Sequence, residues 1–236
     1  MFVTSDDFDI PPYSIPNLQQ VVNTFPLYIE EKERRALSKL LGIQLYQDFI
    51  IGLNSLPPIW EPSPITYNIG DEVLYDVSIW QSLVDANTSV PVEGTDWTKV
   101  EDNKWMILKQ GGTYFINGAQ YVWVGMKRML KPFIYSEWLT DTFDSHSGIG
   151  IVEAKAMNSE VKSPKQRIAD AYNEFAFMAG SSDEFDEVYG YGYYAYYDLY
   201  NQNSLAGFLY SVNSVLPGVY PNWNFYDVRM MNTFGI

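Results

Sequence analysis

Asp141, Asp144 and His146 are the residues whose types come closest to a metal site in this chain. They stand in the segment DTFDSHSG and would offer two carboxylates and one imidazole, the usual metal ligands where cysteine is absent. However, His146 is the only histidine, and the spacing matches no common ligand motif. We therefore prefer a solvated loop here, and the sequence predicts neither a bound metal nor a cofactor.

The other candidate catalytic groups also favour structural interpretations. Glu30, Glu31 and Glu33 would fan around a helix, so we expect them to solvate its surface rather than to form an acid–base pair. Gly111-Gly112 lacks the flanking pattern of a phosphate-binding loop. No nucleophile elbow is present, and a single histidine does not define a catalytic triad. The sequence thus predicts that the protein is not an enzyme.

Charge and composition exclude further classes. The net charge of −14 opposes a nucleic-acid-binding surface, which needs clustered Lys and Arg. A hydrophobic content of 47% excludes global disorder, and the absence of cysteine excludes disulfides. No segment has the length of a membrane span and the first residues do not resemble a signal peptide, so we expect neither membrane contact nor secretion.

The sequence pattern of residues 61–102 predicts a small β module, and the segments on both sides of it are predicted to be helical. Two β-type runs at 72–75 and 79–83 follow a Gly-Asp turn, and a loop leads to Trp97. A module of this size needs support from its neighbours or a tight aromatic core. We expect a β-meander whose core is supplied by Trp97 and Tyr75.

The module resembles the small chitin-binding-type carbohydrate-binding modules. The resemblance is carried by Tyr67, Gly70, Asp71, Val73, Tyr75, Trp80, Asn87, Pro91 and Trp97. It implies that an aromatic side chain stacks on a sugar ring, and Trp80 is the candidate. The alternative for Trp80 is packing inside the protein, because large aromatic residues dominate both cores and interfaces.

The segments on both sides of the module are predicted to form one helical unit, here called the frame. Its first part, residues 1–60, contains two predicted helices. The segment 29–42 has an apolar stripe and ends at Gly42, a typical C-cap. Its stripe consists of Ile29, Ala36, Leu37, Leu40 and Leu41. A second helix from Ile43 to Leu53 should end before the prolines at 57–64.

The second flank, residues 103–180, predicts further elements of the same frame. Asn117-Gly118 between apolar runs predicts a hairpin, and helical spacing from Tyr121 to Trp138 predicts a helix that Pro132 kinks or delimits. Residues 141–162 resemble a long exposed loop. A capping box at Ser163–Gln166 begins a helix over 164–179, with Ile168, Ala171, Tyr172 and Phe175 on its buried face.

Residues 181–236 predict an aromatic interaction arm with a short helix at 204–212. Tyrosine combines apolar area with a polar tip and suits protein interfaces, although a strand pair inside the domain is the alternative. The candidate interaction residues are Tyr193, Tyr194, Tyr196, Tyr197 and Trp223 in the arm, and Trp80, Tyr75 and Trp97 in the module.

The frame resembles the head–tail connector (ring or adaptor) proteins of tailed phages of Bacteroidetes, crAss-like phages included. The likeness rests on LSKLLGIQLYQDFIIGL, WMILKQGG, VWVGMKRMLKPFIYSEWL, GIGIVEAKAMNSEVKSP, QRIADAYNEFAFMAG and the closing YPNW and NTFGI. It implies a mainly α fold: a small helical bundle of the connector type, with the inserted β module and an extended C-terminal arm.

The connector resemblance also implies a place and partners for the protein. The chain would be made in the host cytoplasm and assemble with itself, as a dodecameric ring, at the head–tail junction of the virion. Its neighbours would be the portal protein and other connector or tail proteins. DNA would pass through the ring without specific binding, which the acidic composition suits. The alternative is a carbohydrate-binding protein that acts through the module.

Overall fold

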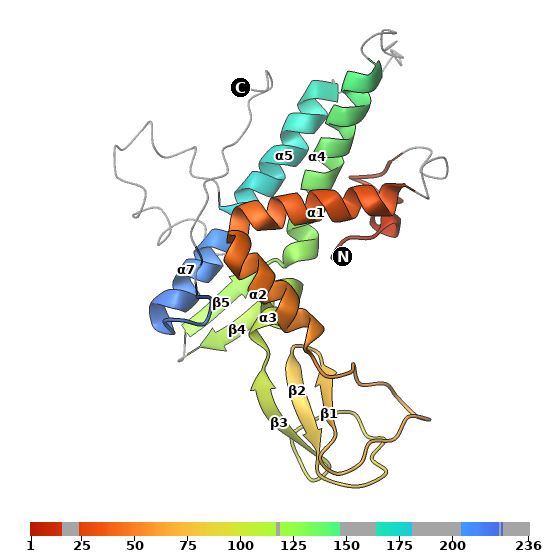
Figure 1. Ribbon diagram of the computed structural model, residues 1–236, viewed down its shortest axis with the longest axis vertical. Coiled ribbons are helices and arrows are strands. Elements are labelled where there is room, and N and C mark those ends of the chain that lie inside the picture. Colours follow the sequence, from red (N-terminus) through yellow and green to blue (C-terminus); the bar gives the residue numbers. More distant parts are fainter. Residues whose placement is uncertain (16–23, 117–118, 147–163, 181–203, 222, 224–236) are drawn as a thin grey trace.

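The computed structural model describes residues 1–15, 24–116, 119–146, 164–180, 204–221 and 223. Helices dominate these residues, accompanied by a three-stranded antiparallel sheet and a separate two-stranded hairpin. Figure 1 shows the three-stranded sheet projecting from the lower end of the helical part. The structure is thus a mixed α/β one in which helices accompany a small β module, broadly as predicted, while the connector-type bundle stays a prediction.

Two consecutive helices begin the frame as predicted. α1 spans Phe25–Leu41 and α2 spans Ile43–Asn54. Gly42 joins them with a φ of 75°, a left-handed value that favours glycine. All five residues of the predicted α1 stripe are buried. α2 ends before the prolines at 57–64, a cluster that disfavours a helix interior.

The inserted β module is a three-stranded meander. Strand β1 (Glu72–Tyr75) pairs with β2 (Ser78–Ser82), and β2 pairs with β3 (Trp97–Asp102), both antiparallel. The turn between β1 and β2 contains Asp76 with a φ of 56°, a conformation that Asp tolerates better than most residues. The predicted meander is therefore present.

A short helix and a hairpin return the chain to the frame. Helix α3 (Lys104–Gln110) was not predicted, although Asn103 caps it with a side chain that accepts from two backbone N–H groups. Strands β4 (Gly112–Ile116) and β5 (Ala119–Trp123) form the predicted antiparallel hairpin. The Asn117-Gly118 turn itself lies outside the described residues.

Two glycines allow a close backbone contact at the end of this hairpin. A Cβ on Gly111 would lie 2.3 Å from the nitrogen of Gly125, and a Cβ on Gly125 would lie 2.3 Å from the oxygen of Gln110. Both glycines also have positive φ angles. Packing of the backbone thus explains why glycine stands at Gly111.

Helix α4 (Met126–His146) differs from the prediction at both ends. It starts later than Tyr121 because residues 121–123 pair with β4, and it runs through Pro132 without ending there. Residues 141–146 are helical, so the predicted loop over 141–162 is wrong at its start, and residues 147–163 lie outside the description. Contact with the helix over residues 164–179 supports this extension.

Helix α5 (Pro164–Ala179) packs along α4, as Figure 1 shows. The rings of Phe133 and Phe175 lie 4.7 Å apart across this contact. The predicted helix is confirmed, with Phe175 buried and Tyr172 half-buried; Ser163 of the capping box lies outside the described residues. α7 (Leu205–Val215) confirms the short helix predicted near the C-terminal arm.

Residues 1–15 form an N-terminal strap across the frame, including the short 3-10 helix η1 (Ser5–Phe8). Its ring contacts join Phe2 to Phe49, Phe8 to Phe25 and Tyr13 to Tyr135, with centroids 5.6, 5.4 and 5.3 Å apart. The hydroxyl of Tyr13 also donates to Glu174. The strap therefore connects α1, α2, α4 and α5.

Candidate functional site

The β module has its own aromatic core, separate from that of the frame. Tyr67, Val73 and Trp97 are buried together. The rings of Tyr67 and Trp97 lie 5.6 Å apart, and the indole N–H of Trp97 donates to the Ser89 oxygens at 3.0 Å. Burial of Trp97 is as predicted. The ring beside it is Tyr67 rather than the predicted Tyr75.

Tyr75 contacts a different tryptophan at the border of the module. Its ring meets that of Trp60 edge-on, with centroids 5.5 Å apart, and it is only half-buried. Tyr75 and Val73 are two residues apart and therefore lie on the same face of the strand. However, Tyr75 lies next to the turn, where the core of the module ends. Strand periodicity could not show this difference, because it predicts on which face of the sheet a side chain lies but not how deeply that side chain is buried.

Trp80 lies on the packed face of the sheet. It is the direct cross-strand partner of Val73 and packs against the module core while remaining half-buried. Its indole nitrogen is buried and has no hydrogen-bond partner among the described residues, and the same holds for Trp60. A ligand could reach the ring of Trp80 at its exposed part but not its N–H group. Contact of Trp80 with a sugar or a protein stays a prediction.

Asn87 organises the loop between β2 and β3. Its side-chain nitrogen donates to Ser82 Oγ and to the Asp96 carbonyl, both at 2.9 Å. Its oxygen accepts from Ser89 N and Oγ at 3.0 and 2.7 Å. Asn87 is 4% exposed and exchanges two backbone hydrogen bonds with Tyr67. The loop, residues 83–96, is therefore held in one conformation by a buried amide.

The acids of α1 are not equivalent, which corrects the prediction that all three solvate the helix. Glu30 and Glu31 are exposed, but Glu33 is 4% exposed. Its carboxylate accepts the N–H of Phe2 at 2.8 Å and that of Val3 at 2.6 Å. Burial raises the pKa of Glu33 despite these hydrogen bonds. The signal was available, because Glu33 falls on the same helical stripe as Ile29 and Leu37.

Asp141 takes part in an ion-pair network that links two helices. Lys32 Nζ lies 2.7 Å from Glu137 Oε2 and 3.2 Å from Asp141 Oδ2, and the hydroxyl of Tyr28 donates to Asp141. The network joins α1 to α4. Burial and the bond to Asp141 raise the pKa of Tyr28. Within the described residues no group of metal-ligating side chains is found. The side chains of Asp144 and His146 lie outside the description.

The candidate residues of the C-terminal arm divide into two groups. Trp223 is half-buried, packs against the frame core, and donates its indole N–H to the carbonyl of Leu40 at 3.2 Å. Its observed contact is therefore internal. Tyr193, Tyr194, Tyr196 and Tyr197 lie outside the described residues.

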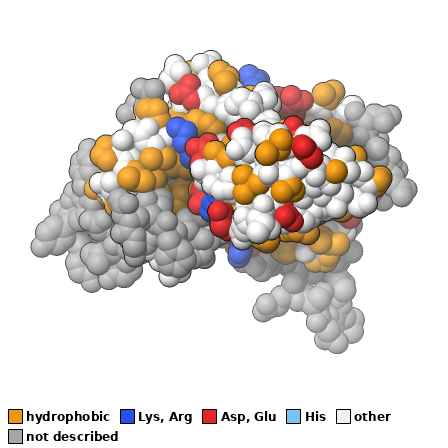
Figure 2. All heavy atoms as spheres, turned by 90° about the horizontal axis from the view of Figure 1, so that it is seen from below, with side chains coloured by type: hydrophobic (Ala, Val, Ile, Leu, Met, Phe, Trp, Pro, Cys, Tyr) orange, Lys and Arg blue, Asp and Glu red, His pale blue; other side chains and the backbone are white. Residues whose placement is uncertain are grey.

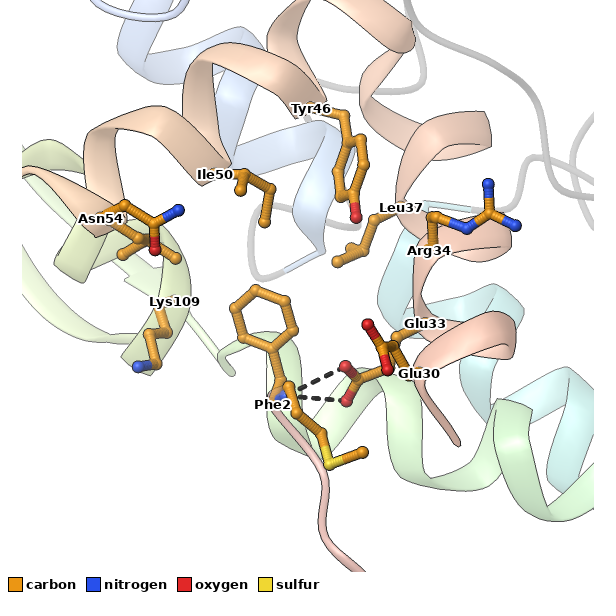
Figure 3. A pocket seen from close by; sticks show the side chains of 11 residues that line it. Phe2, Glu30, Glu33, Arg34, Leu37, Tyr46, Ile50, Asn54 and Lys109 are labelled. Atoms are coloured by element: carbon orange, nitrogen blue, oxygen red, sulfur yellow. Dashed lines mark hydrogen bonds between the residues drawn. The ribbon is translucent and has the colours of Figure 1, made fainter. Parts of the chain in front are cut away.

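A hollow of about 380 Å³ lies where α1, α2, α3 and the strap meet (Figure 3). Leu37, Tyr46, Ile50 and Leu53 form part of its apolar wall. Four charged side chains also line it: Glu30, Glu33, Arg34 and Lys109. The hollow can accept an apolar group flanked by charge. Pattern analysis missed it because three helices and the strap contribute to it.

Charge is unevenly divided between the module and the frame. Residues 61–102 contain nine acids and one base, Lys99, which pairs with Asp102 at 2.6 Å. The frame residues with described side chains contain eleven acids and eleven bases. The module is thus strongly acidic, while the described frame is balanced.

The described helices include none that is long and apolar enough to cross a lipid bilayer. Comparison of the chain with protein-family models, curated proteins and solved structures gives no match.

Proposed function

We propose that this protein is a structural virion protein, a subunit of a head–tail connector ring between portal and tail through which DNA passes. The proposal starts from the sequence resemblance of the frame. The observation that carries it further is that the frame packs continuously across the inserted module. α2 precedes the module and α3 follows it, and the ring of Trp105 in α3 packs on Gly52 in α2. The frame therefore closes on itself as one helical unit.

The charge of the chain also supports a passive channel. DNA that moves through a ring must not be held by clustered Lys and Arg, because each neutralised phosphate adds to a strong, salt-dependent affinity. The net charge is −14, and several frame bases already pair with acids, as Lys127 does with Asp7 at 2.8 Å. A lumen without an excess of unpaired basic side chains would let DNA pass.

Native mass spectrometry and electron microscopy of the purified protein, alone and mixed with its portal, test the proposal. Closed rings in either sample are the expected result, and the mass gives the number of subunits. A strictly monomeric species in both samples contradicts the connector function. DNA added at low salt should not bind the assembled ring.

Carbohydrate binding through the module is the second candidate. Half-buried aromatic rings at Trp60, Tyr75 and Trp80 favour it, because partly exposed aromatic faces can stack on sugars. A broad glycan array tests this function, with Trp80→Ala expected to lose retention and Tyr46→Ala, a half-buried aromatic of the frame, expected to keep it. Failure of the wild-type protein to bind any sugar contradicts it.

A further inference from the structure

A ring requires two different surfaces on each subunit. Closed rings of more than two copies form through head-to-tail contacts, in which one patch of a subunit meets another patch of the next. Complementary charge on the two patches fixes the register and suppresses wrong pairings. A specific contact between two such patches rests on the proposed ring function and deepens it.

The first patch is the module tip, residues 68–72 and 83–96. Two of its aliphatic side chains are largely exposed to solvent: Ile69 is 64% exposed and Val92 is 62% exposed. The tip contains five acids, Asp71, Glu72, Asp85, Glu93 and Asp96, and no base. Figure 2 looks onto this end of the molecule, where apolar side chains lie among carboxylates. The tip is therefore both apolar and negative.

The second patch is the hollow together with the adjoining outer face of α2. α2 is rich in apolar residues but buries few of them, and Ile43 and Ile51 are exposed on its outer side. Arg34 and Lys109 line the hollow and form no ion pair with any described residue. Of the two acids there, Glu33 is already bound to the strap amides. The hollow thus offers an apolar wall with two available cations.

We propose that neighbouring subunits join head to tail, with the acidic module tip of one copy seated on the α2 face and hollow of the next. Val92 and Ile69 would bury their aliphatic side chains against the apolar wall. The tip carboxylates would meet Arg34 and Lys109. The tip carries carboxylates and no cation, whereas the hollow carries two cations that form no ion pair with a described residue; this complementarity of charge points to a second copy of this chain as the occupant. The contact also gives the inserted module a role in assembly.

Variants that change the charge of each patch test the contact. The tip variant is Glu72→Lys with Val92→Lys, and the hollow variant is Arg34→Glu with Lys109→Glu. Among the described residues, none of these four side chains forms a hydrogen bond or an ion pair, so the changes strand no described partner. Each variant alone should raise the concentration for half-assembly by about tenfold or more, because like charges would face each other. Mixing the two restores native pairing at one contact, so mixed complexes containing both variants should form.

Matched variants elsewhere separate the contact from a general effect of charge. Val100→Lys with Glu101→Lys alters exposed residues of β3 outside the tip, and Arg128→Glu with Lys165→Glu alters exposed frame residues outside the hollow. Both should assemble like the wild type, and circular dichroism should show all variants folded.

Three results would overturn the contact. If the tip and hollow variants form rings like the wild type, or if their mixture stays monomeric, the contact is wrong while the ring function stands. A wild-type protein that is monomeric alone and with its portal overturns the ring function and this contact together.

Discussion

The indole of Trp105 occupies the space that a side chain on Gly52 would need. A Cβ placed on Gly52 would lie 2.0 Å from Trp105 Nε1 and 2.1 Å from its Cδ1. The same ring lies 5.9 Å from that of Phe49 and 6.0 Å from that of Tyr220. Since Gly52 precedes the β module and Trp105 follows it, this contact holds the two ends of the insertion together.

Gly52→Ala should therefore destabilise the protein despite the higher helix propensity of alanine. Forcing a methyl group into this space costs about 1–3 kcal/mol through overpacking, which exceeds the gain of about 1 kcal/mol from propensity at most sites. Urea unfolding measures the change. Gly94→Ala is the control, because its Cβ would meet nothing closer than 4.0 Å. Equal stability of the two variants would contradict the contact.

Lys32 and Arg35 both bind Glu137, but they should contribute very differently. The side chain of Lys32 is 9% exposed and that of Arg35 is 64% exposed. Lys32→Ala leaves a partly enclosed carboxylate without its closest cation, so we expect a loss of about 3 kcal/mol. Arg35→Ala should cost at most about 1 kcal/mol, because exposed ion pairs are weak. Thermal unfolding of both variants, with Glu137→Gln to complete the cycle, checks the ranking; similar losses would refute it.

Glu33 should give the folded state a pH dependence in the acidic range. Burial raises its folded pKa above the ordinary value of 4.5, so the folded state holds this proton to higher pH than the unfolded state does. The contribution of Glu33 to stability should thus be largest below pH 4.5 and decline as pH rises through the folded pKa.

Glu33→Gln isolates this effect, because it removes the titration and keeps an acceptor for the strap amides. The stability of the wild type relative to the variant should fall from pH 4 to pH 7, as measured by urea unfolding at each pH. Glu30→Gln is the exposed control and should show no comparable trend. A difference that rises with pH would show that the amide hydrogen bonds outweigh burial.

Asn87→Ala should loosen the β module before the frame. The change removes all four hydrogen bonds of the Asn87 side chain. The Ser82 hydroxyl and the Asp96 carbonyl keep a second partner each, in the Val84 carbonyl and the Leu83 N–H, but the Ser89 N–H loses its acceptor, and an unpaired group of this kind costs about 1–3 kcal/mol. Hydrogen exchange should accelerate within residues 61–102 while α1 keeps its protection. Asn68→Ala, at an exposed position of the same module, is the control. Uniform acceleration along the chain would contradict an independent module core.

Hydrophobic periodicity, together with residues that typically start or stop a helix or a strand, explains which parts of the fold could be predicted from the sequence. α1, α2 and α5 each have an apolar stripe of period 3.6 and a clear stop or start, so their bounds could be predicted within a few residues. The β4–β5 hairpin could be predicted from the single dipeptide Asn117-Gly118 between two apolar runs. These signals are local, and neighbouring elements did not override them.

The errors arose where a distant segment decides the outcome. The strap amides make Glu33 a buried acceptor, although the helix alone would leave it as one of three surface acids. Packing against α5 lets α4 continue past Pro132 to His146, where composition suggested a loop. The hollow likewise needs three helices and the strap. Such features depend on tertiary contacts that no local pattern contains.

The strap also constrains the order of events during synthesis. Tyr13 bonds to Glu174, 161 positions later, whereas the module core closes within residues 67–97. Contacts between distant positions form late because the intervening chain must first be present and ordered. On the ribosome, the module can fold while the strap still waits for α5 to emerge. The strap is thus made before the module but reaches its native place after it, and the frame remains open until α5 has been translated.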